Sequence, residues 1–206
     1  MEAQTLAAGV SALGLDVCTN AQAQLSCYLA LIAKWNKVYN LTAIRERDQM
    51  VVEHLLDSLA ILPHVQPSAV LDIGSGAGLP GIPLAIARRG LQVTVLDSNQ
   101  KKCAFLQQVA IELSLTNVTV ACARAEAYRG ANAFDTVVSR ALADLPTIAR
   151  LSASQLAPGG LILALKGAVP HAELSRLPGA ITARAVIRLS IPGLNAQRHV
   201  VVMTKA

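Results

Sequence analysis

Long apolar runs are absent from this chain of 206 residues, although 53% of them are hydrophobic. No stretch of 18 or more apolar residues occurs, because Asp57, Pro63, Asp72 and Lys166 interrupt the longest ones. A transmembrane helix is therefore not expected. The first ten residues also lack the basic and then apolar order of a secretory signal. We expect a soluble cytoplasmic protein without a membrane partner.

Metal-binding patterns are missing as well. The four cysteines form no C-x-x-C pair, and no histidine is placed to complete a site, so we predict no metal and four buried free thiols: Cys18, Cys27, Cys103 and Cys122. The net charge of +5 is compatible with an anionic partner but does not by itself predict one. Nothing in the composition requires more than a monomer.

The spacing of apolar residues changes near residue 66. Before it, apolar residues recur at helical spacing, so residues 1–65 are predicted to form an N-terminal helical cap. Residues 66–206 alternate short β-branched runs with helical patterns, which is typical of a doubly wound, mostly parallel sheet. The length suits a single structural unit.

Seven strands and four helices are expected in the second part. The predicted strands are 69–74, 91–97, 117–122, 134–140, 160–167, 183–191 and 198–205. The predicted helices are 80–89, 99–115, a short one at 124–130, and 141–157. The sequence PGLNAQ between the last two strands is too short for a crossover helix, so these strands should form an antiparallel hairpin at one edge of the sheet.

The stretch VLDIGSGAGLPG follows the first predicted strand, where open parallel sheets bind ligands. Its glycines, Gly74, Gly76 and Gly78, let a ligand approach the main chain. Leu79 stands where a dinucleotide fingerprint needs glycine, and no Gly-Lys-Ser/Thr of a P-loop follows. A carboxylate close to a phosphate opposes binding by about 1–3 kcal/mol. We therefore expect Asp72 to favour a cationic ligand without phosphate, although a tight turn without a ligand is the simpler alternative.

A second acid strengthens this interpretation. Asp97 ends the second predicted strand, close to the position where nucleoside-binding sheets place an acid on the ribose hydroxyls. Asp97 could equally cap the next helix. Together with Asp72 it indicates a positively charged nucleoside, and S-adenosylmethionine is such a molecule.

The later strand ends complete the predicted crevice. Ala125 and Glu126 follow the third strand, where an adenine would lie. Arg140 ends the fourth strand at the rim, with an ion pair to Asp144 at i+4 as the alternative.

No catalytic nucleophile or base is evident. Methylation of exocyclic amines typically uses a polar residue followed by Pro-Pro-aromatic, whereas this chain reads SRAL after the fourth predicted strand. Methylation of cytosine C5 needs a cysteine nucleophile, and no cysteine lies near the ends of the fourth and fifth strands. Guanine N7 needs neither, so we expect catalysis by alignment and electrostatics, with no catalytic residue identified. A single-stranded base still needs basic surroundings. The candidates are Lys101, Lys102, Arg45, Arg47 and Arg198.

Seven motifs together resemble the ribosomal RNA small subunit methyltransferase G family, formerly called glucose-inhibited division protein B. They are WNKVYNLTAI, HLLDSL, VLDIGSGAGLPGIPLAI, LDSNQKKCAFL, VVSRAL, LALKG and RHVVVMTK, and they span nearly the whole chain. The resemblance implies a Rossmann-like class I S-adenosylmethionine-dependent methyltransferase. It implies methylation of guanine N7 in the 530 loop of bacterial 16S rRNA, with the small ribosomal subunit as partner. The cofactor positions that it implies are Gly74, Leu79, Ala125, Glu126 and Arg140.

Other functions stay open at this point. The acceptor could be another RNA or a small molecule, and the chain could be an S-adenosylmethionine sensor without activity. An NAD-dependent oxidoreductase is disfavoured by Leu79 and Asp72. Trp35 has the helical spacing of a core residue or could stack on a base, and His54 and Asp57 could bond to each other or join the rim of the sheet.

Overall fold

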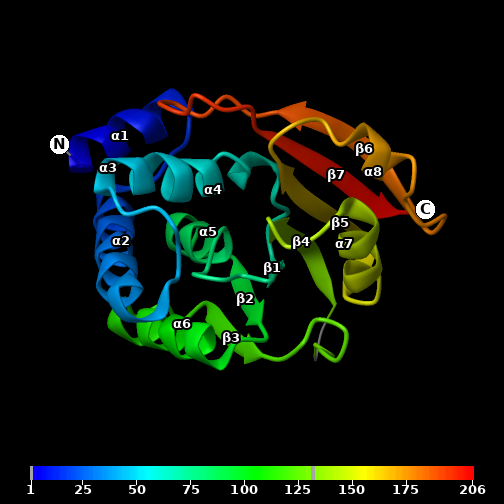
Figure 1. Ribbon diagram of the computed structural model, residues 1–206, viewed down its shortest axis with the longest axis horizontal. Coiled ribbons are helices and arrows are strands. Elements are labelled where there is room, and N and C mark those ends of the chain that lie inside the picture. Colours follow the sequence, from blue (N-terminus) through cyan, green and yellow to red (C-terminus); the bar gives the residue numbers. More distant parts are fainter. Residues whose placement is uncertain (1, 131–132) are drawn as a thin grey trace.

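Seven strands form one mixed sheet in the computed structural model, which describes residues 2–130 and 133–206 (Figure 1). The strand order is β3-β2-β1-β4-β5-β7-β6; β7 runs antiparallel to both of its neighbours, and the other pairs are parallel. The bounds are β1 (Ala69–Ile73), β2 (Gln92–Asp97), β3 (Val118–Cys122), β4 (Phe134–Arg140), β5 (Leu156–Lys166), β6 (Ile181–Arg188) and β7 (His199–Lys205). The predicted doubly wound sheet and its antiparallel C-terminal hairpin are confirmed.

Both faces of the sheet are buried. Successive side chains of a strand point to opposite faces, and in β5 Leu163 and Leu165 belong to one apolar core while Ile162 and Ala164 belong to a second. The larger core also contains the N-terminal helices, α5 (Gly81–Ala87) and α6 (Gln100–Glu112). The second core contains α7 (Leu145–Ala153), beside which lies the short α8 (His171–Leu174). This burial explains why the central strands are almost continuously apolar.

The N-terminal residues are helical, as predicted. Their elements are α1 (Glu2–Ala12), α2 (Thr19–Tyr39), α3 (Arg47–Met50), the π-helical η1 (Val51–Leu56), α4 (Asp57–Leu59) and η2 (Leu62–His64). α2 packs along α5 and α6 on one side of the sheet (Figure 1). The buried Tyr28 of α2 donates its hydroxyl to the carbonyl of Ala77, 2.6 Å away in the glycine-rich stretch. The helical cap therefore supports the loop that follows β1.

Several local predictions are corrected. Residues 124–130 contain a turn at 125–127 and no helix. The helix expected at 141–157 is only α7, because the side chain of Asp144 accepts from Thr147 N and caps the helix there. β5 begins earlier than predicted because Leu156 already pairs with Phe134. Of the four free thiols only Cys103 is buried; the exposed ones are Cys18, Cys27 and Cys122.

The described residues were expected to contain neither a membrane-spanning helix nor a metal site. Among residues 2–130 and 133–206, no helix is long and apolar enough to cross a membrane. In the same part of the chain, no group of three metal-ligating side chains is close enough to hold an ion.

Candidate active site

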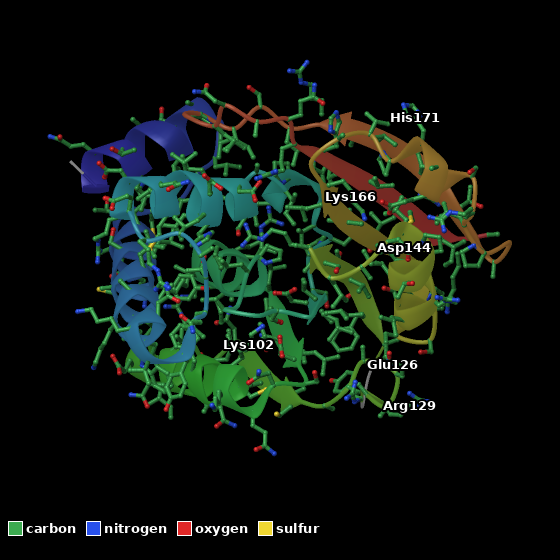
Figure 2. All side chains as sticks on the ribbon, in the orientation of Figure 1. Lys102, Glu126, Arg129, Asp144, Lys166 and His171 are labelled. Atoms are coloured by element: carbon green, nitrogen blue, oxygen red, sulfur yellow. The ribbon has the colours of Figure 1, made fainter. Side chains whose placement is uncertain are left out.

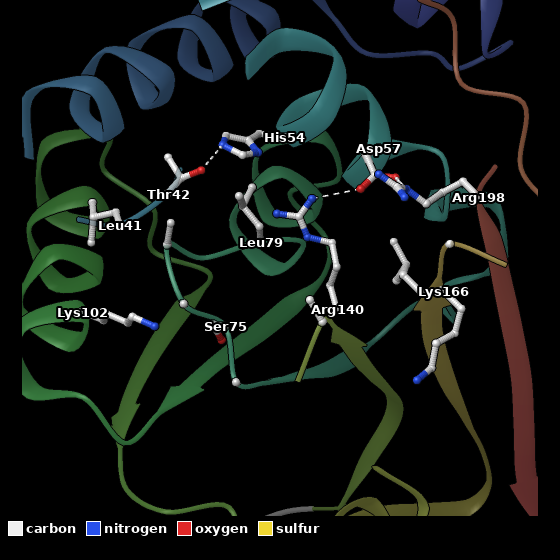
Figure 3. Close-up of a pocket in the computed structure, with 16 residues that line it drawn as sticks. Leu41, Thr42, His54, Asp57, Ser75, Leu79, Lys102, Arg140, Lys166 and Arg198 are labelled. Atoms are coloured by element: carbon white, nitrogen blue, oxygen red, sulfur yellow. Dashed lines mark hydrogen bonds and ion pairs between the residues drawn. The ribbon is translucent and has the colours of Figure 1, made fainter. Parts of the chain in front are cut away.

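Two adjoining cavities lie at the carboxyl ends of the parallel strands, where the strand order reverses between β1 and β4. The cavity on the β7 side has a volume of about 470 Å³ (Figure 3). The cavity on the β2 side has a volume of about 390 Å³. Gly74, Lys102 and Ala141 line both, so the two cavities form one crevice at the place where open α/β sheets bind ligands. Ala141, which no sequence pattern indicated, has a φ of 53° in the left-handed region.

The glycine loop is fixed to the neighbouring strand by its main chain. Gly74, Gly76 and Gly78 have φ angles of 70°, 60° and 96°, which side chains rarely adopt. The N–H of Gly74 donates to Leu96 O at 2.8 Å, and the N–H of Gly76 donates to a carboxylate oxygen of Asp97 at 2.9 Å. The loop therefore turns sharply while its main chain borders the crevice.

Asp97 is half-buried and lines the β2-side cavity. Its second carboxylate oxygen accepts from Asn99 N at 2.8 Å. The cap of α6 is Asn99, whose side chain accepts from Lys101 N and Lys102 N. Asp97 is thus not the helix cap, and its carboxylate borders the space where we predict the ribose.

Asp72 does not face a ligand, so this part of the sequence interpretation is wrong. Its side chain is fully buried and lines neither cavity. Strand alternation points it, like Val70, toward the larger core, where its Oδ2 accepts from Gly81 N at 2.8 Å. Burial raises the pKa of Asp72 to about 7, and its Oδ1 has no described partner. Asp72 therefore holds the start of α5 against β1.

The raised pKa of Asp72 predicts a pH-dependent stability. Between pH 3.8, the ordinary pKa, and about 7, the folded chain keeps a proton that the unfolded chain has lost. The contribution of Asp72 to the unfolding free energy therefore falls as the pH rises through this window, by at most about 1.4 kcal/mol per pH unit. Urea unfolding across this pH range should show the fall for the wild type and not for Asp72→Asn. Parallel stability curves for the two proteins would contradict this assignment.

A buried carboxylate joins the helical cap to two arginines at the rim (Figure 3). Asp57 is 1% exposed; its Oδ2 lies 2.9 Å from Arg140 Nη1 and its Oδ1 lies 2.8 Å from Arg198 Nε. Arg140 Nη1 also donates to Glu53 O at 2.8 Å. The alternative ion pair of Arg140 with Asp144 is therefore wrong. The sequence did not indicate either arginine as a partner of Asp57, because they lie 83 and 141 residues away.

His54 and Lys166 also line the β7-side cavity. His54 Nε2 lies 3.0 Å from Thr42 Oγ1, so His54 bonds to Thr42 and no bond to Asp57 is described. Burial lowers the pKa of His54, which favours the neutral ring. Lys166 Nζ donates to Ala143 O at 2.9 Å and to Glu173 Oε2 at 2.7 Å. Lys166 therefore connects the end of β5 to the segment after β4.

The crevice brings together the predicted cofactor residues. Those on the β7-side cavity are Gly74, Gly76, Leu79 and Arg140. Those on the β2-side cavity are Gly74, Asp97, Ala125 and Glu126. Of the basic candidates, Lys102 and Arg198 line the crevice, whereas Lys101, Arg45 and Arg47 do not. Lys102 of α6 and Glu126 of the turn after β3 both line the β2-side cavity, and Figure 2 labels the two side chains. The ligand contacts of all these residues stay predictions.

Comparison with known proteins identifies relatives along almost the whole chain. The family described as rRNA small subunit methyltransferase G matches residues 21–201. Ribosomal RNA small subunit methyltransferase G of Neisseria meningitidis serogroup A is 48% identical, over 98% of this chain and 98% of the relative. The protein of the same name in Nitrosospira multiformis is 48% identical, over 99% and 98% of the two chains.

Solved structures agree on the fold. TrmN from Thermus thermophilus superposes with a TM-score of 0.59 at 21% identity, covering 72% of this chain and 48% of its own. A SAM-dependent methyltransferase from Thiobacillus denitrificans, in complex with S-adenosyl-L-homocysteine, gives 0.55 at 15% identity, covering 73% and 90% of the two chains. These likenesses show a class I methyltransferase fold. Together with the family match over residues 21–201, they lead to the conclusion that the chain belongs to the rRNA small subunit methyltransferase G family.

Proposed function

We propose that this protein transfers the methyl group of S-adenosylmethionine to N7 of a guanine in the 530 loop of 16S rRNA, and that its partner is the small ribosomal subunit. The observation that carries the proposal is the charge of the β7-side cavity beside the glycine loop. Four basic side chains line it: Lys102, Arg140, Lys166 and Arg198. Asp57 pairs with both arginines and Glu173 pairs with Lys166, so positive charge remains in excess there. Such a cavity attracts RNA phosphates. The rRNA named in the relatives' description supports the same acceptor.

The β2-side cavity fits the nucleoside half of the cofactor. Each oxygen of the Asp97 carboxylate accepts one main-chain N–H, so each has a further lone pair for a ribose hydroxyl. Ile73, Leu96 and Leu142 supply apolar walls. Arg129 Nη1 donates to Glu126 O and to Tyr128 O, both at 2.8 Å, and so holds the turn that we assign to the adenine.

The chain's own residues then align the reaction. When bound, S-adenosylmethionine supplies a methyl group activated by its sulfonium. Arg140 Nη1 is occupied by Asp57 and Glu53 O, which leaves its other N–H groups to bind the carboxylate of the methionine part. Guanine N7 carries a lone pair and no proton, so no base has to remove one. The cysteines of the chain do not line the β7-side cavity, and the carboxylate of Asp57 there is held by two arginines, which suits transfer by alignment alone.

Labelled S-adenosylmethionine and unmodified small subunits test this function. We expect one labelled nucleotide, located in the 530 loop by aniline cleavage at 7-methylguanosine. Label at another nucleotide or on a small molecule would show that the acceptor is not the proposed guanine. Cofactor binding without any turnover would indicate a sensor. Binding of NAD instead of S-adenosylmethionine would indicate an oxidoreductase. We also propose that the protein acts in the cytoplasm as a monomer. The size of the protein, measured with and without subunits, tests the monomeric state.

Lys102 is the expected contact for an RNA phosphate. It lines both cavities, and no hydrogen bond or ion pair of its ammonium group with another described residue is seen. Lys102→Ala should raise the KM for subunits and lower the slope of log K against log salt by about 1, because one fewer counterion is released. Lys205→Ala is the control, since Lys205 ends β7 away from the crevice. Equal salt slopes for wild type and Lys102→Ala would contradict the contact.

A further inference from the structure

An aromatic ladder reaches the surface beside the crevice. The chain has only six aromatic residues (two Phe, one Trp, three Tyr), and three of them meet here. The ring centroids of Trp35 and Tyr39 lie 5.3 Å apart, and those of Trp35 and Phe105 lie 5.5 Å apart. Phe105 is fully buried, whereas Tyr39 is 40% exposed. The Tyr39 ring is therefore held from behind by the core and has a surface available to a ligand.

Cationic and apolar groups surround this ring. Lys101 Nζ lies over the Tyr39 ring, 5.9 Å from its centroid, so this flexible side chain has to move aside for a base to stack there. Val38 is 71% exposed. A groove of about 330 Å³ is lined by Lys34, Trp35, Val38, Tyr39, Gln108 and Glu112. Gln108 Nε2 donates to Glu112 Oε1 at 2.6 Å, which engages the groove's acid. We call Lys34, Trp35, Val38, Tyr39 and Lys101 the Tyr39 platform.

The Tyr39 platform adjoins the β7-side cavity through the chain itself. Leu41 and Thr42, which follow Tyr39 closely, line that cavity, and Lys101 directly precedes Lys102, which lines it too. Figure 3 shows Leu41, Thr42 and Lys102 on the same side of the cavity. A polymer that places one unit in the cavity can therefore extend over the platform.

Aromatic faces beside lysines are typical of single-stranded nucleic-acid sites, because every base has a π face and a neighbouring phosphate. A base that enters a crevice also leaves its neighbours partly unstacked. We propose that the Tyr39 platform binds a nucleobase next to the target guanine: the base stacks on Tyr39, and Lys34 and Lys101 contact the adjoining phosphates. This inference rests on the proposed function and names a second nucleotide site on the protein.

Two variants at Tyr39 test the stacking. Tyr39→Ala should raise the KM for small subunits about tenfold, the effect of one lost base–aromatic stack, with kcat changed by less than about twofold. Tyr39→Phe keeps the ring and should match the wild type. Ile111→Ala removes a side chain that is 73% exposed and lies outside the groove, so it controls for loss of exposed apolar surface. Equal urea midpoints and equal cofactor affinities confirm that the variants are folded. A wild-type KM for Tyr39→Ala would overturn the proposal.

Trp35 provides a readout that does not depend on activity. It is the single tryptophan of the chain and contacts Tyr39. A single-stranded RNA covering the target sequence should quench its fluorescence, and an abasic nucleotide beside the guanine should weaken this binding about tenfold in the wild type but not in Tyr39→Ala. Equal affinities for the intact and abasic RNA would overturn the platform. If Tyr39→Ala weakened the binding of assembled subunits but not of the single-stranded RNA, the platform would also be overturned, because its occupant would then be a ribosomal protein. If instead RNA quenches the Trp35 fluorescence of the wild type in a Tyr39-dependent way but is not methylated, the proposed function fails and the platform stands.

Discussion

Asp57→Ala is expected to lower the unfolding free energy by about 3 kcal/mol and to remove methyl transfer. The carboxylate is 1% exposed and holds Arg140 and Arg198, whose side chains are 20% and 22% exposed. Removing it leaves two facing guanidinium groups without a counter-charge, and breaking a buried pair in this way costs about 3–5 kcal/mol. We expect the lower end of that range because both arginines still reach water. For a chain of this size the loss corresponds to a fall in Tm of about 6–12 °C.

Urea unfolding and subunit methylation measure the two effects of this substitution. Asp57→Asn keeps the shape of the side chain and removes its charge, so it should be intermediate in stability. Asp16→Ala removes an exposed carboxylate and should change the unfolding free energy by no more than about 0.5 kcal/mol. An Asp57→Ala protein with wild-type stability and activity would show that the two arginines are held by other contacts.

Gly74→Asp is expected to reduce the affinity for S-adenosylhomocysteine more than about 100-fold. A Cβ on Gly74 would come within 2.6 Å of Leu142 Cδ1, and the added carboxylate would enter the wall that both cavities share. Such a side chain replaces space that the ligand needs, and no adjustment of Leu142 restores that space. Isothermal titration calorimetry measures the loss directly.

Gly14→Asp is the matched control for this loss. Gly14 has a φ of 66°, close to the 70° of Gly74, and an added Cβ meets nothing within 4 Å. Both variants therefore carry a similar backbone strain, and only Gly74→Asp obstructs the crevice. If both variants bind S-adenosylhomocysteine equally well, the loop after β1 is not the cofactor loop.

The order of strands and helices was predictable from the sequence, because the spacing of apolar residues differs between buried strands and helices. The sequence was also sufficient to bring Gly74, Asp97 and Glu126 to one edge, since the carboxyl ends of parallel strands meet there. The orientation of Asp72 was predicted wrongly, although the same alternation places it on the face of Val70. Contacts formed only by folding, such as that of Asp57 with Arg198, leave no local pattern and were not predictable.

The contact of Tyr28 with Ala77 has a practical consequence for work with shortened proteins. A fragment that starts at residue 66 keeps all seven strands but loses the hydroxyl bonded to the loop's carbonyl. It also uncovers Ile82 and Leu106, which share the larger core with α2. Inhibitor screening and crystallisation trials should therefore use the chain with its first helices, because a trimmed version would present a distorted target.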